Sequence, residues 1–143
     1  MDSFVEALLS EIEHKKDFFK NNGVPLTTIY IGGGTPSLLS PDQLSSITSA
    51  ICTNFGISSL KDIREFTIEI NPDDASREYF SHLKNLGVNR LSMGIQTFFD
   101  EQLKWMNRRH TAAQAVDAYN NARAVGFDNI SLDLILYCQT RQL

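Results

Sequence analysis

Glycines or polar side chains lie near the ends of four β-branched, apolar segments, and their chemistry suits a small polar ligand. The residues concerned are Gly33, Gly34, Thr35, Glu69, Gln96 and Asp133. Carboxylates accept hydrogen bonds from ribose hydroxyls or from an ammonium group. Glycines carry no Cβ, so a ligand can approach the backbone closely. Any one of these residues alone would more often be a solvated polar group. Because residues of this kind lie at the same end of all four segments, they indicate a shared site.

The three consecutive glycines at 32–34 do not match the known phosphate-binding loops. Ser37 stands where Gly-x-Gly-x-x-Gly requires its last glycine, and no Gly-Lys-Ser/Thr follows. A purely structural turn is the alternative interpretation of this loop. The choice between a structural turn and a binding site therefore rests on the segments around this loop.

The apolar segments have the composition of β-strands, and helical patterns separate them. Strands are predicted over residues 27–31, 65–70, 89–95 and 129–136. Helices are predicted over 2–22, 41–55, 75–86, 99–105 and 112–125. Strands that alternate with helices are typical of parallel βαβ units, so we expect an α/β fold.

Each predicted strand has one apolar and one polar face, because side chains alternate with period two. In 65–70, for example, Phe66, Ile68 and Ile70 oppose Thr67 and Glu69. An open parallel sheet covered on both sides would be apolar on both faces. A polar face instead predicts a barrel whose interior holds a polar ligand. An antiparallel sheet with one wet face is the alternative, but helical connections argue against it.

Composition limits the classes of protein that fit. The chain has 143 residues, a net charge of −4 and 42% apolar residues, as expected for one globular domain. It has no extended basic cluster for nucleic acid and no apolar run of about 18 residues for a membrane span. Cys52, expected in the core, and Cys138 have neither a disulfide-framework nor a metal-ligand spacing. These features predict a cytoplasmic protein.

Several further residues have competing interpretations. Arg108 follows a short helix and could reach the same rim to bind a carboxylate; a surface arginine is the alternative. His110 is predicted to be a loop or capping residue. His14 and His82 are expected on exposed helix surfaces, and Trp105 is expected to pack against the fold.

Four segments together resemble one family in their order and spacing. They are Gly-Gly-Gly-Thr-Pro-Ser at 32–37, Glu-Ile-Asn-Pro at 69–72, Asn-Arg-Leu-Ser-Met-Gly-Ile-Gln-Thr-Phe at 89–98, and Ile-Ser-Leu-Asp-Leu-Ile at 130–135. Over roughly residues 3–135 the chain resembles radical S-adenosylmethionine proteins similar to oxygen-independent coproporphyrinogen III oxidase. Arg-Arg-His at 108–110 is similar to the Gly-Arg-x-His segment of the haem chaperone branch.

The resemblance implies a partial (β/α) barrel of parallel strands, with about four of six barrel strands present. It implies that S-adenosylmethionine binds across the strand ends, with Gly33, Gly34 and Thr35 along the methionine moiety. Glu69, Gln96, Arg108 and Asp133 match the remaining contacts of the family. Arg108 is the expected partner of the methionine carboxylate.

The chain departs from the family in two places. A Cys-x-x-x-Cys-x-x-Cys loop, whose thiolates hold a 4Fe–4S cluster, is absent, and Asp133 is not followed by Leu-Ile-Tyr-Gly-Leu-Pro-Gly. We therefore expect one incomplete barrel domain over 1–143, cut from a longer protein, with a frame error near residue 136. This chain alone is expected to be inactive in radical chemistry, and no catalytic residue or metal ligand is assigned.

The favoured function is that of a haem chaperone, whose full-length form would bind S-adenosylmethionine, a 4Fe–4S cluster and haem. One alternative is the oxidative decarboxylation of coproporphyrinogen III to protoporphyrinogen IX. A second is a clusterless haem-binding module that uses His110 or Cys138. A third is a sugar-phosphate enzyme whose glycine loop forms a phosphate nest. Open barrel edges also predict self-association.

Overall fold

Four parallel strands form one sheet in the order β1-β2-β3-β4. The computed structural model describes residues 1–23 and 25–136, apart from the side chains of Phe19, Lys20 and Asn22. The strands are β1 (Thr28–Ile31), β2 (Glu65–Ile70), β3 (Arg90–Gln96) and β4 (Asn129–Leu134). The predicted α/β class is confirmed, and each strand boundary lies within two residues of the prediction.

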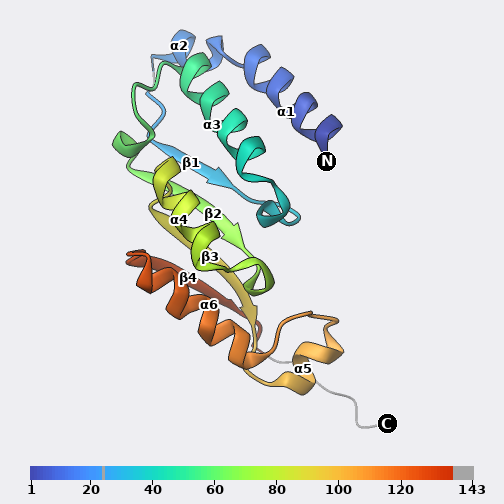
Figure 1. Ribbon diagram of the computed structural model, residues 1–143. Helices are drawn as coiled ribbons and strands as arrows, with labels where there is room; N and C mark the ends of the chain where they lie inside the picture. The colour runs from blue at the N-terminus through green and yellow to red at the C-terminus, as the bar shows by residue number, and fades with distance from the viewer. Residues whose placement is uncertain (24, 137–143) are drawn as a thin grey trace.

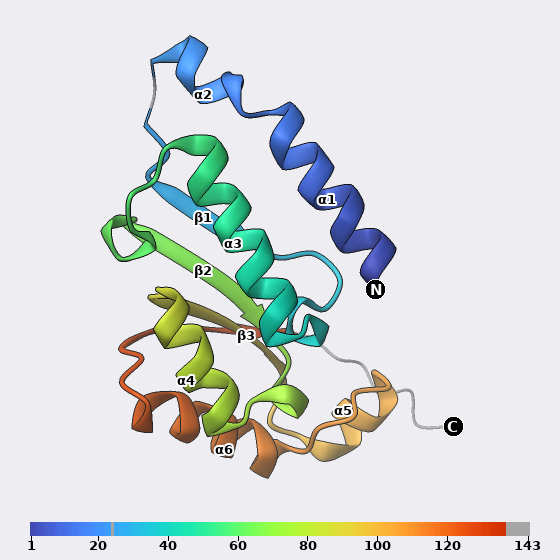
Figure 2. The ribbon, with the colours of Figure 1, turned by 45° about the horizontal axis from the view of Figure 1, so that its top comes forward.

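The helices are α1 (Asp2–His14), α2 (Asp17–Asn22), α3 (Pro41–Phe55), α4 (Arg77–Leu86), α5 (Asp100–Trp105) and α6 (Ala112–Ala124). Three of them, α3, α4 and α6, lie along one face of this sheet, while α1 and α2 pack against α3 and α5 lies beyond the ends of the strands (Figure 1 and Figure 2). Three single 3₁₀ turns, over 36–38, 60–62 and 72–74, were not predicted. Figure 1 shows the curved sheet with the helices around it, and Figure 2 shows α3, α4 and α6 across the same face. Helical connections between successive strands are what parallel pairing requires.

The core fills the layer between the sheet and the helices. The apolar strand residues Phe66, Ile68, Leu91, Met93 and Ile95 are all fully buried. The helices contribute Leu44 and Ile47 from α3, Phe80 and Leu83 from α4, and Ala115, Ala118 and Ala122 from α6. Three alanines let α6 approach the sheet closely. The predicted alternation of faces is therefore confirmed in β2 and β3.

The prediction of one helix over 2–22 is wrong, because α1 ends at His14 and α2 begins at Asp17. The apolar stripe of α1 holds it against α3, but Lys15 and Lys16 occupy the next positions of that stripe. Without an apolar side chain there, nothing holds a further turn on the core. Phe19, which the pattern placed on the same stripe, has a side chain outside the described residues.

Capping residues fix the starts of α3 and α6. The Ser40 hydroxyl accepts a hydrogen bond from the Gln43 amide at 3.2 Å, and Gln43 Oε1 accepts one from the Ser40 amide at 3.0 Å. Thr111 and Gln114 form the same reciprocal pair at α6. Each such box contributes about 1 kcal/mol. Among the described residues, no helix is both long and apolar enough to cross a membrane.

Replacing Tyr79 by phenylalanine is expected to stabilise the fold by about 1 kcal/mol, because its hydroxyl is buried without a hydrogen-bond partner among the described residues. Burial, assisted by the negative charge of Asp74, raises the pKa of Tyr79 from 10.0 to about 12. The fold thus favours the neutral phenol. The contribution of the neutral Tyr79 phenol to the stability of the fold is complete below pH 10 and is lost as the pH rises toward 12.

Urea unfolding of both proteins from neutral to alkaline pH tests this expectation. The loss of stability above pH 10 should be smaller in Tyr79→Phe than in the parent chain. A variant less stable than the parent at neutral pH would show that the hydroxyl has a partner.

Candidate functional site

Polar side chains of neighbouring strands are hydrogen bonded to one another on the sheet face away from the helices. Arg90 of β3 donates from Nη1 to Thr67 Oγ1 at 3.3 Å and from Nη2 to Ser131 Oγ at 3.1 Å. The three residues therefore bridge β2, β3 and β4. This network confirms the polar face expected from strand parity, and it gives the buried polar atoms the partners they need.

A cavity of about 200 Å³ lies at the carboxyl ends of the strands. Its lining contains Gly34, Thr35, Pro36, Glu69, Ile70, Asn71, Ser92, Gly94, Gln96, Arg108 and Asp133. Six of the seven predicted site residues are among them; the exception is Gly33. Ligands of parallel α/β folds bind at this end of the strands.

The glycine loop is joined to β2 through Glu69. The Gly33 amide donates to Glu69 Oε2 at 3.0 Å, and the Tyr30 hydroxyl donates to Glu69 Oε1 at 2.9 Å. Gly33 is not part of the cavity lining, but its backbone amide is bonded to Glu69, which is. Gly33 and Gly34 have φ values of 81° and 69°, in the left-handed region that glycine adopts most easily. A Cβ on Gly32 would lie 2.7 Å from Glu69 Oε1, so the loop needs glycine there as well.

Replacing Glu69 by glutamine is expected to lower the pKa of Tyr30 toward its ordinary value of 10.0. The hydrogen bond to the Glu69 carboxylate is the largest cause that raises this pKa, followed by burial. Because folding raises the pKa of Tyr30, the neutral Tyr30 phenol contributes to the stability of the fold. This contribution is complete below pH 10.0 and is lost as the pH rises through the pKa of Tyr30 in the folded protein.

Absorbance titration of the phenolate checks this result, with Tyr30→Phe identifying the signal of Tyr30. Glu65→Gln is the matched control, since Glu65 lies on the same strand and accepts its hydrogen bond from Thr67. An unchanged titration in Glu69→Gln would mean that the Tyr30–Glu69 hydrogen bond does not form in solution.

Arg108 is held at the rim of the cavity by two acceptors. Its Nη2 donates to Asn71 Oδ1 at 3.1 Å and to the Gly94 carbonyl at 2.9 Å. A Cβ on Gly94 would lie 3.4 Å from that Nη2 and 2.9 Å from Gln96 Nε2. Gly94 therefore leaves room for two of the lining side chains. Arg108 is half-buried and lines the cavity, which favours the rim position over a plain surface arginine.

Asp133 enters the cavity from the outermost strand, where Ser92 holds it. The Ser92 hydroxyl lies 3.3 Å from Asp133 Oδ2 and 3.4 Å from Oδ1, and it donates to this carboxylate. Ser131 Oγ lies 3.3 Å from Ser92 Oγ. A carboxylate that takes one hydroxyl donor keeps further lone pairs for a ligand.

Besides the apolar lining residues Pro36 and Ile70, four residues of the site were not predicted individually: Tyr30, Asn71, Ser92 and Gly94. Tyr30 and Ser92 lie on the predicted polar faces, so strand parity was the signal for both. Asn71 entered the sequence-based prediction only as part of the Glu-Ile-Asn-Pro segment and received no role of its own. The position of Gly94 on the polar face of β3 was the only sign that bulky neighbours converge there.

The other candidate residues lie outside the cavity. His110 is in the predicted loop, but it is 2% exposed and its Nε2 lies 3.1 Å from the Ile95 carbonyl. Trp105 is 62% exposed, so its expected packing role is wrong. Cys52 is only half-buried, and burial raises the pKa of its thiol. His14 is exposed as expected, whereas His82 is half-buried. Cys138 lies outside the described residues.

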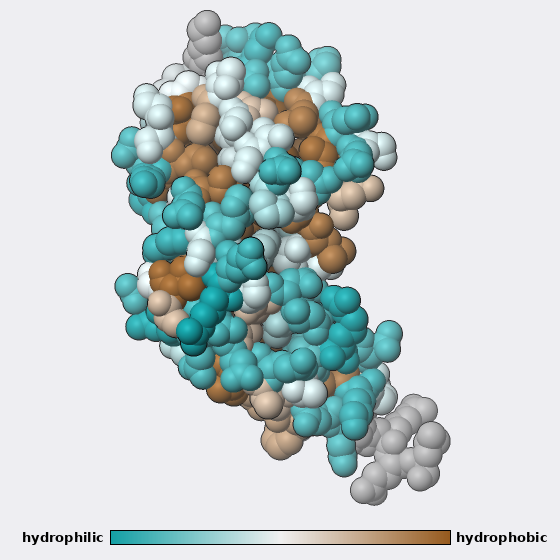
Figure 3. Space-filling model, viewed as in Figure 1, coloured by the Kyte–Doolittle hydropathy of each residue, from teal (hydrophilic) through white to brown (hydrophobic). Residues whose placement is uncertain are grey.

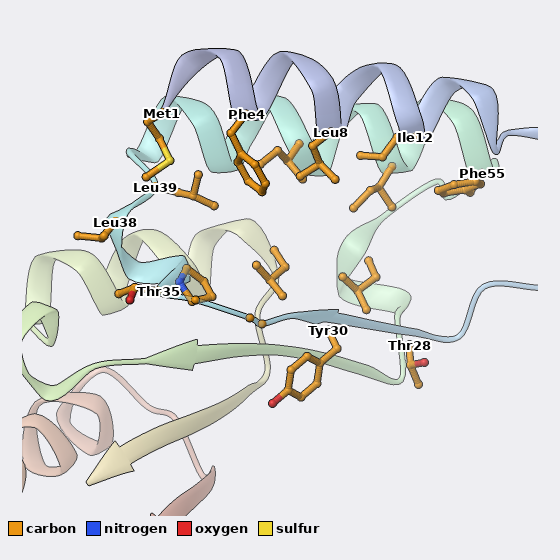
Figure 4. Close-up of a pocket in the computed structure, with 18 of the residues that line it drawn as sticks. Met1, Phe4, Leu8, Ile12, Thr28, Tyr30, Thr35, Leu38, Leu39 and Phe55 are labelled. Atoms are coloured by element: carbon orange, nitrogen blue, oxygen red, sulfur yellow. The ribbon is translucent and has the colours of Figure 1, made fainter. Parts of the chain in front are cut away.

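A second, larger cavity of about 650 Å³ lies between α1, α3 and β1. Figure 4 shows Phe4, Leu8 and Ile12 of α1 directed toward it, and Figure 3 shows hydrophobic side chains gathered where these elements lie. Its lining is dominated by aliphatic and aromatic groups, with the glycine loop at one end. It lacks the charged groups of the smaller cavity and does not suit the predicted polar ligand.

The charges of the smaller cavity suit a ligand with both an amino acid and a sugar. Arg108 matches a carboxylate, and Glu69 and Asp133 match an ammonium group and ribose hydroxyls. The volume is below the roughly 300–1,000 Å³ of typical ligand pockets, so the cavity has room for only part of such a ligand. The described residues contain no group of three or more histidines, cysteines or carboxylates placed to hold a metal ion. They do not fit a 4Fe–4S cluster.

Comparisons with known proteins agree with this geometry. The chain is 42% identical to the haem chaperone HemW of Bacillus subtilis and 41% identical to that of Lactococcus lactis. Both alignments cover 94% of the chain, but only 35% and 33% of the relatives. The chain therefore spans about a third of the length of these curated relatives.

Solved structures give the same result for the fold. Coproporphyrinogen III oxidase (HemN) from Escherichia coli superposes with a TM-score of 0.81 at 33% identity, over 93% of this chain and 30% of that chain. Elp3 from Methanocaldococcus infernus, at 19% identity and a TM-score of 0.66 over 90% of this chain and 34% of that chain, shares the fold alone. The model of the Radical SAM superfamily matches residues 3–140, so the chain belongs to the radical S-adenosylmethionine superfamily.

Proposed function

We propose that this chain forms part of a haem chaperone of the HemW kind and that its smaller cavity binds S-adenosylmethionine. One observation carries the binding proposal. Residues far apart in the sequence, from Gly34 to Asp133, converge on a single cavity at the strand ends. The identity to two haem chaperones supports the choice within the superfamily.

Each charged group of the cavity receives a role in this proposal. The Arg108 guanidinium keeps donors beyond Nη2 for the methionine carboxylate, while Asn71 and Gly94 orient it. Glu69 accepts from Tyr30 and Gly33 and keeps lone pairs for the ammonium group. Asp133 serves the ribose hydroxyls, and Gln96 supplies an amide that both donates and accepts. The backbone of Gly34 and Thr35 lies along the methionine moiety.

No radical step is assigned to these residues. In the superfamily, a 4Fe–4S cluster supplies the electron that cleaves S-adenosylmethionine, and three cysteines hold it. Residues 1–143 contain two cysteines, far apart, which cannot provide that ligand set. Production of 5′-deoxyadenosine by this chain under reducing conditions would contradict the assignment.

Calorimetric titration with S-adenosylmethionine tests the binding role. We expect saturable binding that weakens about tenfold or more in Asp133→Ala, since a charge-assisted hydrogen bond contributes roughly 1.5–3 kcal/mol. Asp128→Ala is the matched control, because that carboxylate is exposed and pairs with Arg123. If S-adenosylmethionine produces no heat of binding and does not raise the unfolding temperature of the chain, the proposal is rejected. Protection by inorganic phosphate alone would favour the sugar-phosphate alternative.

Coproporphyrinogen III oxidation is the second candidate, favoured by the close superposition with HemN. The two functions differ in what the full-length protein does with a tetrapyrrole. A chaperone binds haem and passes it to an acceptor protein. An oxidase converts coproporphyrinogen III to protoporphyrinogen IX. Product analysis with the full-length protein separates them, since decarboxylated product would reject the chaperone role.

The clusterless haem-binding module has weaker support. The His110 ring is buried and lies against the Ile95 carbonyl, so neither nitrogen is accessible to a haem iron without rearrangement. We therefore expect the same Soret titration for the parent chain and for His110→Ala. A lost or shifted Soret band in the variant would restore His110 as a haem ligand.

We further propose that the four strands belong to one (β/α) barrel domain of a cytoplasmic protein. In the described structure, β1 and β4 each pair with one strand only, and unpaired strand edges promote association. Leu134 of β4 is 50% exposed, which adds an apolar contact surface. Sedimentation of the 143-residue chain should show self-association that increases with concentration. A monomer at all concentrations would contradict it.

A further inference from the structure

Gln96 has a backbone conformation that its side chain does not favour. Its φ is 70°, in the left-handed region, and the pairing of β3 with β4 is irregular between Met93 and Gln96. A residue other than glycine in this region costs about 1–3 kcal/mol and persists only where its surroundings fix it. The conformation turns Gln96 into the cavity at the end of β3.

Three backbone and side-chain donors fix the peptides on either side of Gln96. The Ile95 carbonyl accepts from the Thr97 amide at 2.9 Å and from His110 Nε2 at 3.1 Å. The Gln96 carbonyl accepts from the Ile135 amide at 2.8 Å. Two of these donors belong to the backbone next to the irregular pairing. His110 supplies the one side-chain donor, and it comes from a different part of the fold.

The His110 ring is bonded to the backbone carbonyl of Ile95, whose own side chain is buried in the core. His110 is 2% exposed, and its Nδ1 has no hydrogen-bond partner among the described residues. A carbonyl oxygen can only accept, so Nε2 is the donor in this hydrogen bond. The next residue, Thr111, caps α6 and ties the His110 backbone to the start of that helix.

We propose that His110 is a positioning residue that holds Gln96 in its ligand-binding conformation through the Ile95 carbonyl. The buried ring donates from Nε2 to this carbonyl, and its Nδ1 has no hydrogen-bond partner among the described residues. His110 thereby links the start of α6 to the rim of the cavity without touching the ligand. The part of this inference that concerns ligand affinity rests on the proposed function.

Two variants of equal length separate this role from simple packing. His110→Gln and His110→Met both fill the site with an unbranched side chain, but only glutamine offers an N–H near the place of Nε2. Amide hydrogen exchange of the 143-residue chain follows the Ile135 amide, which is bonded to the Gln96 carbonyl. Calorimetry with S-adenosylmethionine follows the affinity in the same proteins.

In His110→Met we expect exchange at Ile135 to become about tenfold faster and binding about tenfold weaker, the size of one lost hydrogen bond. His110→Gln should stay within about threefold of the parent chain in both measurements. The effect of His110→Met on affinity should vanish when Gln96→Ala is already present, because the two residues act through one contact.

Equal exchange in the Met and Gln variants, or a uniform acceleration over all strands, would overturn the proposal in favour of packing. An undiminished loss of affinity in the Gln96→Ala background would overturn it as well. If the parent chain does not bind S-adenosylmethionine, the proposed function fails, and the exchange at Ile135 still decides the structural role of His110.

Discussion

Replacing Arg108 by methionine is expected to weaken S-adenosylmethionine binding by about 100-fold, the largest effect of any single lining residue. The change removes a charge-assisted contact to the ligand carboxylate, which contributes roughly 1.5–3 kcal/mol. It also leaves Asn71 Oδ1 and the Gly94 carbonyl without their donor at the cavity rim. Calorimetric titration of the 143-residue chain measures the change.

Arg109→Met is the matched control, because the neighbouring arginine is exposed and pairs with Asp73 at 3.2 Å. Exposed ion pairs contribute about 0–1 kcal/mol, so its affinity should stay within about twofold of the parent chain. Equal effects of the two substitutions would mean that net positive charge attracts the ligand. A strong effect of Arg109 alone would mean that the two arginines have been assigned the wrong roles.

The largest effect on stability is expected at Phe127, whose replacement by alanine should lower the free energy of unfolding by about 3–5 kcal/mol. The ring is fully buried, and its contacts with an aromatic ring and a lysine both come from α4. It makes an edge contact with Phe80 at 6.0 Å between ring centroids, and Lys84 Nζ lies 4.6 Å from its centroid. Alanine would remove these contacts and leave a cavity in the layer under the sheet.

Denaturant unfolding followed by circular dichroism measures this loss. Phe99→Ala makes the same change at a side chain that is 68% exposed, and we expect it to alter stability by less than about 0.5 kcal/mol. A Phe127→Ala loss below about 1 kcal/mol would show that neighbouring side chains collapse into the space. Such a small loss would mean that Phe127 is not a main contributor to the stability of the core.

The fold was largely predictable because local signals and packing agree along this chain. Ser40, Thr111 and Gly87 mark helix ends, and period-two alternation marks β2 and β3. The failure at residues 2–22 has a local cause. Helical propensity continues through Lys15 and Lys16, but only packing against α3 decides where α1 stops. The single 3₁₀ turns lack a repeating pattern and therefore left no comparable signal.

The site was predictable where a strand delivers the residue. Glu69 and Asp133 follow directly from strand parity, since the ends of parallel strands meet at one edge. Arg108 reaches the cavity from a loop, and strand parity says nothing about loops. Its position after a short helix allowed two interpretations, a rim residue or a surface arginine, and the family resemblance favoured the first. The left-handed conformation of Gln96 was not foreseeable, because it depends on His110 and Ile135, which approach from later parts of the chain.

The sequential strand order β1-β2-β3-β4 has a consequence for synthesis on the ribosome. Each strand pairs with the strand made just before it, so every new βα unit meets an edge that is already in place. Chains of this kind can fold in the direction of translation. The lining of the smaller cavity, however, is completed only by Asp133 on β4. If this cavity binds the proposed ligand, the ligand cannot act as a template for β1, β2 and β3, because its site is incomplete until β4 has emerged.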